Sequence, residues 1–359
     1  MRQSDTVARL GGDEFVVLLQ DLGGTELEAT TRAGLLGEEI LQSLSESYRL
    51  PGGEVSSTPS IGVVMFRGPQ VTVDELLKQA DLAMYQAKEA GRSTVCFFDP
   101  RVQAAFAERM ALEADLRQAL AGGQFVLYYQ PIVDDQRRTV CMEALLRWQH
   151  PVRGLVSPAA FVPLAEKNGL IVPIGLWVIE QACRQLLRWR SEPAQRDWQL
   201  AVNVSARQFR QGDFVAQVIA LMDRFEVGVG QLKLEITESL LQDNLQDTVH
   251  KMKLLRARGV RFAIDDFGTG YSSLSYIKEL PMHVLKIDRS FVDRVDADES
   301  DAAISRTILA LALHLGLDVI AEGVETESQF ATLRGFGCRL FQGYLFGRPA
   351  PLPAAEVAA

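Results

Sequence analysis

The sequence predicts an α/β fold, a TIM-like (β/α) barrel, for the part of the chain that follows Pro100. Three observations indicate this fold. Eight apolar runs have the length of β-strands, helix-length stretches lie between most of them, and the pattern fits within about 235 residues. A doubly wound open sheet shows the same alternation, so periodicity alone does not separate the two folds.

The expected strands of this second segment are 125–133, 139–148, 199–204, 231–236, 260–264, 284–287, 318–321 and 339–344. The expected helices are 158–167, 174–189, 213–225, 245–258, 300–315 and 325–335. Only the short polar turn 134–138 separates the first two strands, which predicts a hairpin. One strand of the barrel is therefore expected to run antiparallel to the others.

A smaller segment, 1–100, precedes the barrel. It ends with an expected helix over 73–90, which stops at Gly91, and a short strand over 93–98. A helix over 101–121 is expected to connect the two segments and to open the second. The last residues, 352–359, are small and predict a frayed tail.

Composition excludes several classes of protein. In 359 residues, 47% are hydrophobic and 23% charged, which is ordinary for a globular chain and excludes a disordered or collagen-like one. The net charge of −9 argues against binding to a nucleic-acid polymer. Four scattered cysteines without C-x-x-C spacing argue against a disulfide framework or a structural zinc site. The most apolar stretch, 307–317, is too short to span a bilayer, so we expect a cytoplasmic chain that makes no membrane contact itself.

Polar side chains lie within or just after the expected strands of the barrel. A single acid at a strand end is usually a helix N-cap or a solvated loop residue, but a whole set in this position is not expected by chance. In a barrel, the carboxyl ends of the strands meet at one rim, where active sites lie. The set consists of Glu143, Asn203, Glu235, Asp265, Asp266, Lys286, Asp288, Glu322, Glu325 and Gln342.

Carboxylate and amide oxygens without histidine or cysteine suit Mg²⁺ or Mn²⁺. Converging acids cannot all stay ionised unless cations neutralise them. Two divalent ions roughly 3.5–4 Å apart would do so, and would activate a water and polarise a phosphoryl oxygen. Lys286 is then either a plain counter-ion or a partner of the attacking water. In the second case the acids hold its ammonium group and the metals lower the pKa of the lysine. Arg147 lies four residues beyond Glu143 on the same strand face and can bind phosphate.

The ordered motifs resemble the EAL domain of bacterial cyclic di-GMP phosphodiesterases. The match runs from about Phe106 to Pro349, and we place the domain at 106–351. The motifs are Glu143-Ala144-Leu145, Asn203-Val204-Ser205, Glu235-Ile236-Thr237-Glu238-Ser239, Asp265-Asp266-Phe267-Gly268-Thr269-Gly270, Lys286-Ile287-Asp288, Glu322-Gly323-Val324-Glu325 and Gln342-Gly343-Tyr344-Leu345-Phe346.

The resemblance implies a TIM-like barrel with one antiparallel strand, two Mg²⁺ or Mn²⁺ ions, and hydrolysis of cyclic di-GMP to linear pGpG. It also implies a homodimer through the EAL domain. The implied metal ligands are Glu143, Asn203, Glu235, Asp265, Asp266 and Glu322. Lys286 would assist the water, Gln342 and Glu325 would orient it, and Glu238 would hold the loop 266–273. Arg147 would bind phosphate, Gln130 would face guanine, and Asp288 is assigned to the substrate.

The first segment resembles the C-terminal half of an α+β GGDEF domain, the domain of diguanylate cyclases. The motif is Arg9-Leu10-Gly11-Gly12-Asp13-Glu14-Phe15, and the stretches Ser60-Ile61-Gly62-Val63 and Asp81 to Arg92 agree. The resemblance implies catalytic or metal roles for Asp13 and Glu14, and triphosphate contacts for Lys88 and Arg92. Arg2 and Asp5 resemble the inhibitory product-binding site of such cyclases.

About half of a complete GGDEF domain is absent before this motif, so we expect a piece of a longer protein, with any sensory or membrane-anchoring region upstream. The run 15–19 has the apolar character of an interior strand, and it would be left with an exposed edge.

Three functions remain open on the sequence. The first is a metal-dependent cyclic di-GMP phosphodiesterase, and the second is a non-catalytic receptor that binds the same ligand and signals through protein contacts. The third is diguanylate cyclase activity with GTP bound at the GGDEF remnant, which the missing half of that domain argues against. Metal-dependent turnover separates the first two.

Overall fold

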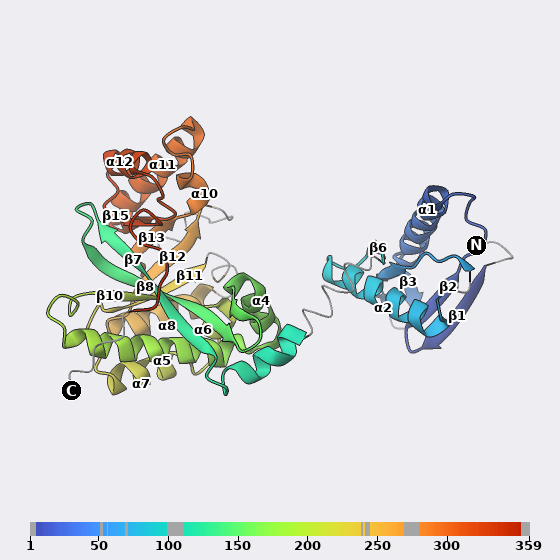
Figure 1. Cartoon of the computed structure of the whole chain (residues 1–359), viewed down its shortest axis with the longest axis horizontal. Helices are drawn as coiled ribbons and strands as arrows, with labels where there is room; N and C mark the ends of the chain where they lie inside the picture. Colours follow the sequence, from blue (N-terminus) through green and yellow to red (C-terminus); the bar gives the residue numbers. More distant parts are fainter. Residues whose placement is uncertain are drawn as a thin grey trace. The chain divides into compact units, whose positions relative to one another are not determined.

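A computed structural model (Figure 1) describes residues 5–50, 53–55, 57–68, 71–98, 111–237, 240, 245–268 and 280–352. The chain forms two compact units, Met1–Leu112 and Glu113–Ala359. Each is considered by itself below.

In the part of the first unit that the structure describes up to residue 98, there are three two-stranded sheets and two helices. Strands β1 and β2 pair antiparallel, as do β3 and β4, while β5 and β6 pair parallel. The expected helix and strand near the end of this segment correspond to α2 and β6. The elements are β1 (Thr6–Gly11), β2 (Glu14–Leu18), α1 (Glu26–Leu44), β3 (Tyr48–Leu50), β4 (Gly53–Val55), β5 (Ile61–Val63), α2 (Val73–Glu89) and β6 (Val95–Phe97).

Helix α2 lies directly against β5 at Gly62. A Cβ atom on this glycine would fall 2.2 Å from the carbonyl oxygen of Ala80, so no larger residue fits without moving the helix. The run 15–19 does not have the burial of an interior strand: Phe15 on β2 is 62% exposed, and β2 pairs with β1.

The second unit contains the strands and helices of the barrel. They are β7 (Phe125–Asp134), β8 (Thr139–His150), β9 (Gly154–Val156), α4 (Pro158–Asn168), α5 (Ile171–Arg190), β10 (Gln199–Asn203), α6 (Ala206–Phe209), α7 (Phe214–Arg224), β11 (Leu232–Thr237), α8 (Leu245–Ala257), β12 (Arg261–Phe267), β13 (Val284–Ile287), α10 (Arg289–Val292), α11 (Glu299–Leu315), β14 (Asp318–Ala321), α12 (Glu327–Gly335) and β15 (Leu340–Gln342).

Eight of these strands close into a barrel, which confirms the TIM-like fold. The order is β8, β10, β11, β12, β13, β14, β15 and β7, and β7 returns to β8. Strand β7 pairs antiparallel with both β15 and β8, so the predicted antiparallel strand is confirmed. An open doubly wound sheet is excluded because β10 pairs with both β8 and β11.

Small and branched apolar side chains fill the barrel below the rim. They form one buried cluster: Ile132, Cys141, Ala201, Ala263, Val284 and Ile320. Helices such as α5 and α11 cover the outside of the strands (Figure 1). A packed interior of this kind holds the strand ends, and therefore the rim, in fixed positions.

Several expected boundaries needed correction. Helix α5 begins at Ile171 rather than 174, and α12 begins at Glu327 because Thr326 forms a capping box with Gln329. The helix expected over 101–121 is described as helical over 111–119; residues 99–110 and 353–359 lie outside the described part. Helix α1 and the short strands β3, β4 and β9 were not predicted. Within the described residues, each helix is too short or too polar to cross a membrane.

Candidate active site

The ammonium group of Lys286 lies among four carboxylates inside the barrel. Its Nζ atom is 2.6 Å from Glu235 Oε2, 2.6 Å from Glu322 Oε1 and 2.9 Å from Asp265 Oδ1. Glu143 Oε2 is farther away, at 3.8 Å. These residues come from five different strands or their ends, β8, β11, β12, β13 and β14, as the strand-end pattern predicts. Lys286 is 1% exposed, so solvent does not screen these charges.

The charges in this group shift one another's protonation. Burial raises the pKa of Glu235 to about 8, with Glu143 and Asp265 adding to the rise and Lys286 opposing it. Burial also raises the pKa of Glu322. For Lys286, burial would lower the pKa, but the four carboxylates together raise it well above its usual value. In the protein without metal, the pKa of Lys286 is therefore raised, whereas bound metals were expected to lower it.

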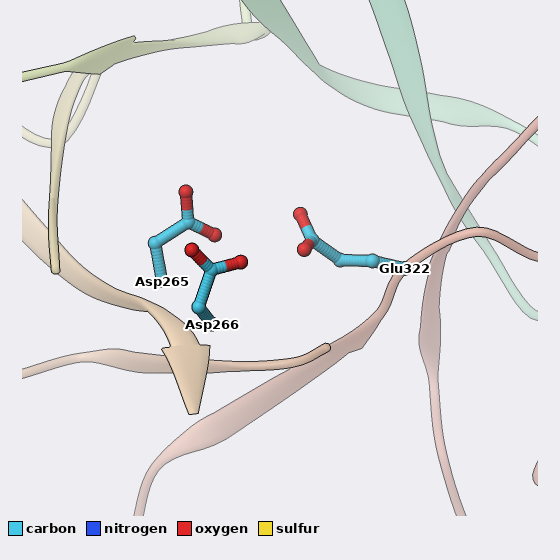
Figure 2. A group of neighbouring side chains, drawn as sticks. All are labelled: Asp265, Asp266 and Glu322. Carbon is cyan, nitrogen blue, oxygen red and sulfur yellow. The ribbon is translucent and has the colours of Figure 1, made fainter. Parts of the chain in front are cut away.

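Asp265 and Asp266 both enter the site although they are neighbours on one strand. Successive side chains of a regular strand point to opposite faces. Here the pairing of β12 with β13 is irregular between Ile264 and Phe267, and Asp266 has a φ of 53°, in the left-handed region. As a result, oxygens of Asp265, Asp266 and Glu322 lie within 4.8 Å of one another. Figure 2 shows the three carboxylates facing a common space.

A chain of amides lies on the Glu143 side of the site. Asn203 Nδ2 donates to Glu143 Oε1 at 2.6 Å, and Gln342 Nε2 donates to Glu143 Oε2 at 2.5 Å. The same Gln342 nitrogen reaches Gln130 Oε1 at 3.1 Å, and Gln130 Nε2 donates to the carbonyl of Gly347. Gln130 is opposite Glu143 in the β7–β8 register and is 8% exposed. It therefore lies within the barrel wall, and its role toward guanine stays a prediction.

The other predicted site residues lie farther from Lys286. Asp288 caps α10, where its carboxylate accepts from the Ser290 backbone N–H at 3.0 Å. Asp288 also acts on Asp266. The pKa of Asp266 is raised mainly by burial and further by the negative charges of Asp265 and Asp288. Glu325 pairs with Arg289 Nη2 at 3.0 Å.

Arg147 is placed on β8 over the ring of Tyr128, 5.5 Å from its centroid, and donates to the carbonyl of Leu146. Glu238 and most of the loop 266–273, from 269 onward, lie outside the described residues.

The donor set fits a hard divalent cation. Glu235 Oε1 is buried and has no hydrogen-bond partner among the described residues, and the unpaired oxygen of a buried carboxylate is costly unless a cation or donor meets it. The oxygens of Asp265, Asp266 and Glu322 supply further ligands of the type that Mg²⁺ and Mn²⁺ prefer.

In the first unit, the GGDEF motif forms a hairpin. Gly11 ends β1, Gly12 and Asp13 form the turn, and Glu14 begins β2. Gly12 has a φ of 52°, which a tight turn requires, and Arg9 donates to its carbonyl oxygen. Lys88 lies in the last turn of α2, and Arg92 follows that helix. Asp5 precedes β1, and Arg2 lies outside the described residues.

Sequence reasoning missed one interior lysine and one ion pair. Lys233 is 2% exposed and its Nζ lies 3.7 Å from Cys141 Sγ, one layer below Glu235 on β11. The alternation Leu232-Lys233-Leu234-Glu235 could have indicated an inward-facing lysine, because alternate strand residues share a face. The pairing of Arg289 with Glu325 had no signal in the sequence.

A TIM-like barrel with acids, amides and one lysine at its rim defines a class of candidate metal-dependent enzymes. Comparisons with known proteins give the family. The EAL domain model matches residues 113–349, so the chain belongs to the EAL domain family. The model described as diguanylate cyclase, GGDEF domain, matches residues 1–94.

Relatives at this level of similarity share both segments. The chain is 44% identical over 352 residues to the bifunctional diguanylate cyclase/cyclic di-GMP phosphodiesterase MucR of Pseudomonas aeruginosa, covering 98% of this chain and 50% of that protein. It is 40% identical over 357 residues to the cyclic di-GMP phosphodiesterase NbdA of the same organism, covering 99% of this chain and 45% of that protein. The chain thus spans about half the length of these relatives.

A solved structure, the PaMucR phosphodiesterase in a c-di-GMP complex, is also similar. It has 47% sequence identity and a TM-score of 0.65, and the match covers 67% of this chain and 98% of that one.

Proposed function

We propose that the EAL domain of this chain hydrolyses cyclic di-GMP to linear pGpG with two Mg²⁺ or Mn²⁺ ions. The observation that carries the proposal is the arrangement around Lys286, where carboxylates from Glu235, Asp265 and Glu322 lie within 2.9 Å of one ammonium group. The names of MucR and NbdA, and the c-di-GMP complex of PaMucR, support the choice of substrate.

The residues that would hold the ions are Glu143, Asn203, Glu235, Asp265, Asp266 and Glu322. When bound, the ions supply an activated water and polarise a phosphoryl oxygen. The uncompensated oxygen of Glu235 and the shared space between Asp265, Asp266 and Glu322 support this assignment. For Asn203, the amide oxygen would be the ligand, since its nitrogen donates to Glu143.

Lys286 would act on the attacking water. Its Nζ is fixed by carboxylates on several sides, so its N–H groups point to defined places in the site. A positioned ammonium can hold the water by a hydrogen bond and stabilise the charge that develops on the phosphate. Gln342 would orient the same water through its buried amide, and Glu325 would act from the rim through its pairing with Arg289.

Further residues would contact the substrate. Arg147 would bind a non-bridging phosphate oxygen, since its guanidinium has donors beyond the one that meets Leu146. Asp288 and Gln130 would contact the ligand, and Glu238 would hold the loop that begins at Asp266. These roles follow from the family resemblance.

For the first unit we propose a regulatory role without catalysis, and for the EAL domain a homodimer. Asp13 and Glu14 lie on an exposed hairpin, and within the described residues the one group of three acids close enough to hold a metal is Asp265, Asp266 and Glu322. GTP binding to this unit is tested by titration with a labelled nucleotide, and dimerisation by light scattering.

The decisive experiment is incubation of the whole chain with cyclic di-GMP and Mg²⁺, with and without chelator, followed by chromatography of the nucleotides. We expect pGpG only when the metal is present. Tight binding of cyclic di-GMP with no product at any metal concentration would overturn the enzymatic proposal and favour a receptor. Glu192→Ala, an exposed residue between α5 and β10, is the matched control and should retain full turnover.

A further inference from the structure

A second candidate site lies at the end of the barrel opposite the acids. Arg261 begins β12 and His283 immediately precedes β13, whereas Asp265 and Lys286 lie toward the other ends of the same strands. Both residues line a cavity of about 260 Å³, together with Arg256 from the last turn of α8 and the residues Val229 and Val260. The cavity takes no part in the chemistry proposed above.

The cavity is cationic in a chain whose net charge is −9. Arg256 and Arg261 line it directly. The buried Lys233 is close enough to act on His283. Burial lowers the pKa of His283 to about 4, and the charges of Arg261, Arg256 and Lys233 contribute in the same direction. The carboxylate of Asp318 opposes them.

The hydrogen-bond donors of the cavity are only partly used. A guanidinium carries five N–H donors. Arg261 makes one ion pair, from Nη2 to Asp318 Oδ2 at 3.0 Å, and its Nε has no acceptor among the described residues. His283 Nδ1 accepts from the backbone N–H of Phe262 at 3.1 Å, so the proton of the neutral ring is on Nε2. Because Arg261 Nε is buried, an acceptor with several oxygens would be met by the remaining guanidinium N–H groups of Arg261, by Arg256 and by the imidazole Nε2–H.

We propose that this cavity binds a small phosphate-bearing anion. Two guanidinium groups and an imidazole N–H are the donors that bind phosphate oxygens in proteins. The volume lies below the usual range for sites of drug-sized ligands, roughly 300–1,000 Å³, so inorganic phosphate or a small phosphomonoester fits the cavity better than a nucleotide. Val260, which is buried, forms an apolar part of the lining, whereas Val229 is exposed at the mouth of the cavity.

The simplest structural alternative is that Arg261 serves only to pair with Asp318 and that the cavity holds solvent. The two accounts differ in the effect of Asp318. If Arg261 serves only to pair with Asp318, then removing the Asp318 carboxylate lowers the stability of the fold and creates no affinity for phosphate. If the cavity binds an anion, Asp318 competes with that anion for Arg261, and its removal tightens binding.

The test uses the whole chain with chelator present, so that metal does not draw phosphate to the acidic site. Methyl NMR signals of Val229 and Val260 are followed during titration with inorganic phosphate at constant ionic strength. We expect saturable shifts of both signals. Glycerol 3-phosphate should give the same shifts if a phosphomonoester is the ligand, and 5′-GMP should bind more weakly because of its size.

Four variants make the test sharp. Arg256→Gln and Arg261→Gln should each weaken phosphate binding by about tenfold, the loss of one charge-assisted contact. Asp318→Asn should tighten it severalfold. Arg258→Gln is the matched control, because Arg258 lies in the same turn but pairs with Asp223 and does not line the cavity. Asp318 is 59% exposed, so its variant is expected to fold even if Arg261→Gln does not.

Non-saturable shifts with phosphate, or equal affinity for acetate, would overturn the proposal. Unchanged affinity in Asp318→Asn and Arg256→Gln would do the same. These outcomes are independent of whether the acidic rim hydrolyses cyclic di-GMP.

Discussion

Lys286 Nζ and Glu235 Oε2 lie 2.6 Å apart in the interior of the barrel. Their residues belong to β13 and β11, which are separated in the sheet by β12. Both side chains are essentially inaccessible to solvent. This contact holds the ammonium group inside a group of acids, while the other oxygen of Glu235 has no hydrogen-bond partner among the described residues. A lysine held in this way can act at a fixed point, and the acids around it retain unmet oxygens for cations.

Replacing Glu143 by alanine should abolish hydrolysis of cyclic di-GMP. The change removes a predicted metal ligand and the acceptor that orders both Asn203 and Gln342. Product formation is measured by chromatography at saturating Mg²⁺, beside Glu192→Ala. Undiminished turnover would contradict the assignment of Glu143 to the metals.

Replacing Lys286 by methionine should cut kcat by roughly a hundredfold or more and leave substrate affinity nearly unchanged, the pattern of a group that acts in the transition state. Turnover and cyclic di-GMP affinity are measured separately, the latter with Ca²⁺. Lys253→Met, on the exposed face of α8, is the control. An effect on affinity alone would show that Lys286 is a counter-ion or a phosphate clamp.

Calcium should not replace magnesium in turnover. Ca²⁺ has longer bonds and looser geometry, so the water and the phosphate would lie in the wrong places for attack. Rates are compared in Mg²⁺, Mn²⁺ and Ca²⁺ at equal saturation. Similar rates in Mg²⁺ and Ca²⁺ would count against an ordered water at this site.

Without metal, the free energy of unfolding should fall as the pH rises from about 4.5 to 8. Glu235 has a pKa of about 8 in the folded protein against 4.5 for an ordinary glutamate. Between these values the folded state holds a proton that the unfolded state has lost, so each pH unit costs at most about 1.4 kcal/mol. Mg²⁺ displaces that proton, and its stabilising effect should grow over the same range.

Thermal melts at several pH values, with chelator and with Mg²⁺, measure this dependence. Glu235→Gln removes this titrating group and should reduce the slope of the curve recorded in chelator, with Glu322 and Asp266, whose pKa values are also raised, accounting for the slope that remains. A metal-induced rise in Tm that is equal at pH 5 and pH 8 would argue against a protonated Glu235.

The chain should make no cyclic di-GMP from GTP, even when Glu143→Ala prevents its breakdown. Phosphoryl transfer needs the metal and the nucleotide to be fixed together. Asp13 and Glu14 lie on an exposed hairpin, and the adjacent Phe15 is exposed as well, so the hairpin by itself does not enclose a nucleotide. Product analysis after incubation with GTP and Mg²⁺ checks this. Detection of cyclic di-GMP would overturn the non-catalytic role of the first unit.

The sequence by itself determined the alternation of strands and helices and the list of rim residues, while the choice of a barrel over an open sheet came from the family resemblance and from the pairing of β10 with both β8 and β11. Apolar runs of strand length, separated by helix-length stretches, predict the elements because each element must bury one face. Polar residues at the strand ends predict the site because parallel strands of a barrel end at a common rim. For that reason Glu143, Glu235, Lys286 and Glu322 were predicted together, and the structure brings them together.

Only the tertiary structure decided how the acids face one another. Strand periodicity would send Asp265 and Asp266 to opposite faces, but an irregular pairing with β13 and the left-handed backbone of Asp266 bring both toward Glu322. Likewise, the pairing of Arg261 with Asp318 and the cavity beside them join residues from separate strands. Such contacts depend on register and closure of the barrel, which are set by packing between distant segments and leave no local pattern in the sequence.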